Sequence, residues 1–180
     1  MNFAGHIHTF LMRQTHWVRD TLMSILSLNS VSKSFGALTV IDDASFDVPQ
    51  GQALGIIGPN GAGKSTLFNL ITGNIKSDKG TIHFESRNVT KVSAMERCLT
   101  GIGRSFQIPQ PFEKLTVYEN LLVAATYGRN QSEAAVRDDC ADVLERTELI
   151  ERANTPAGQL SLLERKRLEL SRALATQPKL

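Results

Sequence analysis

Residues 58–66 of this chain read Gly58, Pro59, Asn60, Gly61, Ala62, Gly63, Lys64, Ser65 and Thr66. The stretch fills every fixed position of the phosphate-binding loop G-x-x-x-x-G-K-S, known as Walker A. Before it, the apolar run of residues 53–57 predicts a buried parallel strand. After it, helical spacing over residues 67–71 predicts a helix that stops at Gly73. Strand, glycine loop and helix are the setting that this motif requires, and a chance glycine-rich loop is the alternative.

The residue types of this loop indicate how it would hold a nucleoside triphosphate. Glycines at 58, 61 and 63 permit left-handed backbone angles and let the main chain approach a phosphate closely. The loop N–H groups and the N-terminus of the following helix would point at negative charge. Lys64 would contact the β- and γ-phosphates, and the Ser65 hydroxyl would ligate Mg²⁺.

Composition limits the other functions that this chain can have. Its 180 residues suffice for one α/β domain, and 20 Lys+Arg against 18 Asp+Glu leave a net charge of +2. The two signs are interspersed, which argues against a nucleic-acid partner. The basic run at 165–167 lies in a helical pattern and indicates a solvated helix face rather than a phosphate or lipid patch. No run approaches 18 apolar residues, so no membrane span is predicted.

The two cysteines, Cys98 and Cys140, lack metal-type or redox-type spacing and fit reduced thiols in a cytosolic protein.

Residues 1–22 hold three of the four histidines, including His6 and His8, but no accompanying cysteine or carboxylate set. We therefore interpret these histidines as incidental rather than as metal ligands. Residues 1–22 are predicted to be a disordered extension or a misassigned start, because Met23 begins a stretch typical of a domain start.

The remaining pattern places strands first and helices last. Alternation over residues 26–28, 44–48 and 82–84 predicts half-exposed antiparallel strands, with turns at 49–51 and 86–88. Residues 101–107 read as a short extended segment. Capping boxes at Thr116–Glu119 and Ser161–Glu164 each open a predicted helix, and a further amphipathic helix is predicted over residues 136–147.

Three further stretches, taken with the phosphate loop, resemble the ATP-binding subunits of ABC transporters. Residues 101–107, ending in Gln107, look like the approach to the family's Q-loop. Leu160 and Ser161 open a predicted helix that continues through residues 165–175 and resembles the signature helix. Phe35 takes the place of the aromatic residue on which the family stacks adenine. The resemblance covers residues 24–180. The sequences of residues 67–73 and 112–124 are similar to those of ATP-binding subunits of the branched-chain amino acid importer type.

The resemblance implies an α/β fold of the P-loop NTPase class. We expect an ABC-type nucleotide-binding domain over residues 23–180, with an antiparallel β part, a RecA-like core and a helical subdomain at about 109–160. The implied cofactors are ATP and Mg²⁺. Gln107 would reach Mg²⁺ and the attacking water. The alternative is that Gln107 is a hydrogen-bonded turn residue without a role at the metal. Ser161 would face the γ-phosphate held by a second subunit, a role compatible with N-capping its own helix. The alternative to adenine stacking is that Phe35 is a core residue at the end of a strand.

Two departures from the family pattern qualify this expectation. Leu162 and Leu163 stand where the family signature has glycines. The chain reaches Leu180 where the family continues into a strand ending in Asp-Glu, so the resemblance implies a C-terminally incomplete domain without Walker B and without the catalytic Glu. Such a chain is expected not to turn over ATP, because the group that activates water would be missing. It is also expected to fold poorly alone, because strands flanking residues 53–57 would be missing.

The partners implied by the resemblance are membrane permease subunits, a second ABC ATPase subunit and, indirectly, a periplasmic binding protein. The implied location is peripheral, on the cytoplasmic face of the inner membrane. Two alternatives stay open: an inactive remnant of such a subunit, and a soluble ABC ATPase with no role in transport. The sequence does not identify the transported solute, because these subunits do not touch it.

Overall fold

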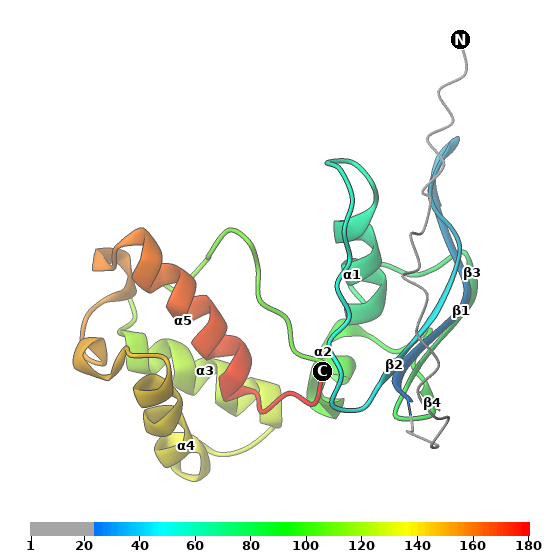
Figure 1. Cartoon of the computed structure of the whole chain (residues 1–180). Helices are drawn as coiled ribbons and strands as arrows, with labels where there is room; N and C mark the ends of the chain where they lie inside the picture. Colours follow the sequence, from blue (N-terminus) through cyan, green and yellow to red (C-terminus); the bar gives the residue numbers. More distant parts are fainter. Residues whose placement is uncertain (1–23) are drawn as a thin grey trace. The chain divides into compact units, whose positions relative to one another are not determined.

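The computed structural model describes residues 24–180, so the extension predicted over residues 1–22 lies outside the described part (Figure 1). The chain divides into two compact units. The first comprises the described residues up to Ile71 together with Ile75–Lys91, and the second comprises Thr72–Asn74 and Val92–Leu180.

The first unit is built on a four-stranded sheet of order β2-β1-β3-β4. Its strands are β1 (Ser24–Phe35), β2 (Leu38–Pro49), β3 (Lys79–Phe84) and β4 (Arg87–Asn88). Every neighbouring pair is antiparallel, which confirms the antiparallel part predicted from the alternating residues. The central strand β1 buries Leu26, Leu28 and Val31, and Leu28 pairs with the buried Ile82 of β3. Figure 1 shows β1, β2 and β3 running side by side.

The helix predicted after the phosphate loop is confirmed as α1 (Lys64–Thr72). It buries Leu67, Leu70 and Ile71, three of the four residues whose spacing predicts the helix, whereas the fourth, Phe68, is exposed. The helix stops at Gly73, which has φ +80° and would place a Cβ 2.9 Å from Nε of Arg97. A left-handed backbone and close packing therefore both require glycine at this position.

The buried parallel strand predicted over residues 53–57 is wrong. The segment has no regular secondary structure, and Leu54 and Ile57 are 50% and 98% exposed. A strand is held by a ladder of hydrogen bonds to a neighbour, and within residues 24–180 the sheet consists of β1 to β4 and does not reach this segment. An apolar sequence without a pairing strand lacks the interactions that would fix it as a strand.

Helices dominate the second unit. They are α2 (Ala94–Thr100), α3 (Val117–Arg129), α4 (Glu133–Arg146) and α5 (Leu162–Ala175), with short 3₁₀ turns η1 (Ile150–Arg152) and η2 (Ala157–Gln159). The capping boxes at Thr116 and Ser161 are both confirmed, as is the amphipathic helix that became α4. The helices α3, α4 and α5 share a buried core that includes Leu121, Leu144 and Leu168.

Both cysteines are free thiols in this second unit. Cys140 is fully buried in the core of α3 to α5, and this burial raises the pKa of its thiol to about 11. Burial likewise raises the pKa of Cys98. Both thiols are therefore protonated at neutral pH and poorly nucleophilic.

Among residues 24–180, no helix is long and apolar enough to cross a membrane.

Candidate nucleotide-binding site

The phosphate loop joins the exposed segment 53–57 to the start of α1. Gly61 and Gly63 have φ values of +83° and +80°, so both use the left-handed backbone that the sequence predicts for them. Gly58 does not, which corrects the prediction at that position. A Cβ on Gly58 would lie 3.2 Å from Cβ of Ala62, so glycine there provides room where the loop folds back on itself.

Gly63 anchors the end of the loop against β2. A Cβ at this position would lie 2.9 Å from the carbonyl oxygen of Val40 and 3.0 Å from Cδ1 of Ile41. The positive φ and the close approach to the Val40 main chain both exclude a side chain. The sheet thereby fixes where the loop turns into α1.

Lys64 spans the loop rather than projecting into solvent. Its Nζ donates hydrogen bonds to the carbonyl oxygens of Gly58, at 2.6 Å, and Pro59, at 2.7 Å. An ammonium group has three donors, so these two bonds hold it in place and leave one N–H for a ligand. The first turn of α1 holds no acidic residue, so no carboxylate there competes with an anion for the helix N-terminus.

The start of α1 supplies further donors beside Lys64. Leu67 makes the first i→i−4 bond, donating its N–H to Gly63 at 2.8 Å. The N–H groups of residues 64–66 precede that bond and have no helical acceptor. The Ser65 side chain is exposed in the same turn. This loop and helix start therefore concentrate backbone donors and one fixed cation, the arrangement that binds phosphate.

Phe35 lies in the same unit as the loop, at the end of β1. The residue is 51% exposed and does not belong to the buried core of the described residues. It precedes Gly36, whose φ of +60° turns the chain into β2. The Nζ of Lys33 lies 5.5 Å from the ring centroid, within the range of a cation–π contact.

The other two predicted site residues, Gln107 and Ser161, lie in the second unit. Gln107 is exposed in the loop between α2 and α3. Ser161 caps α5: its hydroxyl accepts the Glu164 N–H at 3.3 Å, and the Glu164 carboxylate accepts the Ser161 N–H at 2.8 Å. Leu162 and Leu163 are 66% and 62% exposed, so the leucines that replace the family's glycines stand on the surface beside Ser161.

The segment around Gln107 is held by residues of α5 that the sequence did not single out. The buried Glu169 accepts the Phe106 N–H at 3.3 Å. The guanidinium of Arg172 donates to the carbonyl oxygen of Gln110 at 2.9 Å and lies 5.3 Å from the centroid of the Phe112 ring. These contacts join positions about 60 residues apart in the sequence, which no local pattern could have indicated.

The comparison with known families settles the class of this chain. The family model described as ABC transporter matches residues 41–180. The chain belongs to the ABC transporter family. The α/β fold class predicted from the sequence is therefore confirmed as that of an ABC nucleotide-binding domain.

Relatives of this ABC family chain include two proteins named LivG. One, from Methanocaldococcus jannaschii, is named "Probable branched-chain amino acid transport ATP-binding protein LivG" and is 37% identical over 91% of this chain and 68% of its own length. The high-affinity branched-chain amino acid transport ATP-binding protein LivG of Escherichia coli K12 is 34% identical over 87% of this chain and 67% of its own length. The lipopolysaccharide export system ATP-binding protein LptB of Haemophilus influenzae is 32% identical over 87% of this chain and 65% of its own length.

A solved structure gives the same result for the fold. The ADP conformation of an ATP-binding cassette from an ABC transporter superposes with a TM-score of 0.77 and 36% identity, over 87% of this chain and 66% of that one. The ABC family chain described here thus spans about two thirds of the length of the relatives that it matches.

Proposed function

We propose that this chain is the ATP-binding subunit of an ABC importer and that the loop at 58–66 holds the phosphates of ATP. The observation that carries the proposal is the position of the Lys64 ammonium, fixed at 2.6 and 2.7 Å from two carbonyl oxygens of its own loop. A cation held there by the main chain, beside the donors of a helix N-terminus, fits the β- and γ-phosphates of a nucleotide.

The other site residues have distinct roles in this proposal. The Ser65 hydroxyl would ligate Mg²⁺ together with the phosphates, because Mg²⁺ usually takes one or two protein groups and completes its shell with phosphate and water. Among residues 24–180, no group of three or more His, Cys, Asp or Glu side chains could hold a metal ion, in keeping with such a shared site. Gln107 would orient the attacking water at the Mg²⁺, and Ser161 would cap the phosphates bound by a second ABC subunit.

Bound ATP supplies the phosphoryl group whose transfer powers such a transporter. The chain's own residues bind and orient it: Lys64 and the loop N–H groups neutralise the phosphates, and the exposed ring of Phe35 offers a face to the adenine. In the proposed complex, two ATPase subunits energise membrane permease subunits from the cytoplasmic face of the inner membrane. A periplasmic binding protein would supply the solute.

We propose branched-chain amino acids as the transported class. The support is the LivG name of two relatives and the importer-like wording of residues 67–73 and 112–124. In the source cells, replacing the gene by a Lys64→Ala copy should abolish uptake of labelled leucine, isoleucine and valine but not of an unrelated amino acid. Unchanged uptake of all three would contradict the importer assignment and favour another ABC function, such as the export role in the name of LptB.

Replacing Phe35 by Ala should weaken ATP and GTP alike, by about fivefold, because an aromatic contact of this kind contributes about 1 kcal/mol. Phe35→Tyr should bind both nucleotides almost as well as the native chain, since it keeps the flat ring. Fluorescence titration with a labelled ATP analogue, competed by each nucleotide, measures both changes. Normal affinity in Phe35→Ala would show that the ring does not contact the base.

We further propose that a polypeptide of residues 1–180 binds ATP without hydrolysing it. Transfer to water needs a group that positions or deprotonates that water, and the loop at 58–66 contains no Asp or Glu. Phosphate release by the native polypeptide should equal that of Lys64→Ala. Turnover that disappears with the Lys64→Ala substitution would show that this chain carries its own catalytic carboxylate.

A further inference from the structure

Asp78 is joined to the end of β1 by three hydrogen bonds. Its Oδ1 accepts the Lys33 ammonium at 2.7 Å, and its Oδ2 accepts the Ser34 N–H at 2.7 Å. Its own N–H donates to the carbonyl oxygen of Ser32 at 2.9 Å. Asp78, which lies 44 positions from Ser34 in the sequence, is therefore hydrogen-bonded to three consecutive residues that lead into Phe35.

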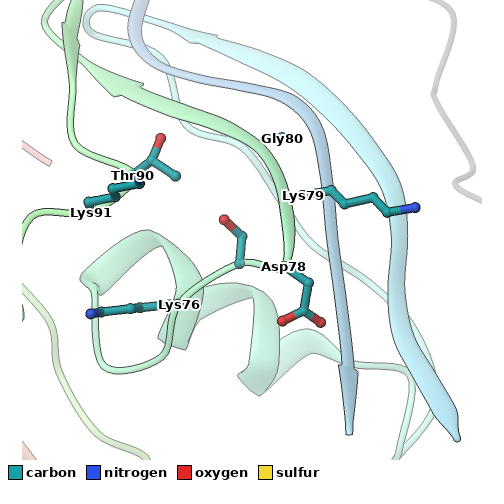
Figure 2. A pocket seen from close by; sticks show the side chains of 7 residues that line it. Lys76, Asp78, Lys79, Gly80, Thr90 and Lys91 are labelled. Atoms are coloured by element: carbon teal, nitrogen blue, oxygen red, sulfur yellow. The ribbon is translucent and has the colours of Figure 1, made fainter. Parts of the chain in front are cut away.

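The chain around Asp78 is pressed against β1. Gly80 has φ +79°, and a Cβ there would lie 2.3 Å from the carbonyl oxygen of Ser30. Only glycine permits this approach. Figure 2 shows Asp78 on the segment between α1 and β3, with its carboxylate pointing toward β1. The close approach at Gly80 thus holds the main chain next to Asp78 against β1.

The Lys33 side chain is held over the ring of Phe35 by this carboxylate. It is only 17% exposed, and its ammonium lies 5.5 Å from the ring centroid. The Lys33 and Ser34 hydrogen bonds, in that order, hold the pKa of the Asp78 carboxyl below its usual value. The carboxylate is therefore ionised at neutral pH, and the bonds that it accepts are charge-assisted.

We propose that Asp78 is a positioning residue of the nucleotide site: by holding the Lys33 ammonium and the Ser34 N–H, it fixes the ring of Phe35 for the base. This inference rests on the proposed function, because it takes Phe35 as the ring that stacks on adenine. Fixing the ring before the nucleotide arrives removes the entropy cost of ordering it on binding. Loss of Asp78 should therefore weaken contacts to the base and leave contacts to the phosphates unchanged.

A competing interpretation of this region is an anion site, because the pocket beside Asp78 is lined by Lys76, Lys79 and Lys91. Figure 2 shows the side chains of Lys76 and Lys79 extending in opposite directions, so they do not converge on one ligand. Asp78 is among the residues that line the same pocket, and its negative charge would repel an anion. The geometry favours a positioning role for this carboxylate.

The test compares Mg-ATP with Mg-tripolyphosphate, which carries the phosphates but no base. In Asp78→Asn we expect ATP affinity to fall about two- to fivefold, no further than in Phe35→Ala, because only the pre-ordering of that ring is lost, with tripolyphosphate affinity unchanged. A fall in ATP affinity is the opposite of what the charge change alone predicts, because removing a negative charge should strengthen the binding of a polyanion. In a Phe35→Ala background, Asp78→Asn should have no further effect on ATP.

The matched control is Asp47→Asn, which makes the same charge change at an exposed position of β2. It should leave both affinities unchanged. Unchanged ATP affinity in Asp78→Asn, or an equal loss for ATP and tripolyphosphate, would overturn the positioning role. If the native chain bound tripolyphosphate no better than Lys64→Ala does, the phosphate site itself would be refuted, and the inference on Asp78 with it.

Discussion

Lys64→Ala is expected to weaken the binding of Mg-ATP by about ten- to a hundredfold. The substitution removes a charged donor to phosphate, and a hydrogen bond to a charged group contributes about 1.5–3 kcal/mol. It also removes the two bonds to Gly58 and Pro59 that tie the side chain across its loop. Competition titration with a labelled ATP analogue measures the change.

The control for Lys64→Ala is Lys91→Ala, which removes the same charge from an exposed residue of the same unit. It should change ATP affinity by less than about twofold, because exposed charges interact weakly through water. Equal affinities of the native chain and Lys64→Ala would refute phosphate binding by this loop. A similar loss in both variants would point to a general effect of net charge.

Asn120→Ala is expected to destabilise the second unit by about 1–3 kcal/mol, since it leaves the part-buried Phe112 N–H without its side-chain acceptor, and a polar group left without a partner costs about that much. Asn120 is fully buried on α3. Its side-chain oxygen accepts the Phe112 N–H at 2.9 Å, and its amide donates to the carbonyl oxygens of Phe112, at 3.1 Å, and Thr116, at 2.9 Å. One side chain thus satisfies the turn that leads from the Gln107 segment into α3.

Urea unfolding followed by circular dichroism measures this loss as a lower midpoint. Gln131→Ala, at an exposed position just after α3, is the control and should unfold like the native chain. Asn120→Asp keeps the acceptor but loses both donors and should also unfold at a lower urea concentration. An unchanged midpoint in Asn120→Ala would show that water replaces the amide at no cost.

The parts of the fold that the sequence predicts are those set by local interactions. A capping box joins residues three apart, so Thr116 and Ser161 mark the starts of α3 and α5 without knowledge of the rest of the chain. The same pattern at Ser93 and Glu96 opens α2. Alternation likewise indicates β1 and β3, because one face of each strand packs into the sheet.

The parts that the sequence does not predict depend on distant partners. Residues 53–57 have the composition of a buried strand, but a strand needs a neighbour to pair with, and composition does not report whether one is present. Asp78 is a single acidic residue before β3 whose importance appears only when the fold brings it to Lys33 and Ser34. The importance of Glu169 and Arg172 on α5 likewise appears only when the fold brings them to Phe106 and Gln110.

Nucleotide selectivity tests most directly whether the loop at 58–66 recognises a chain of phosphates. The native chain is titrated calorimetrically with Mg-ATP, Mg-tripolyphosphate and AMP in one buffer. We expect ATP and tripolyphosphate to bind at one site, with AMP weaker than ATP by about a hundredfold, because a single phosphate cannot engage both Lys64 and the helix N-terminus as the β- and γ-phosphates would. AMP binding as tightly as ATP, or no binding of tripolyphosphate, would contradict phosphate recognition by this loop.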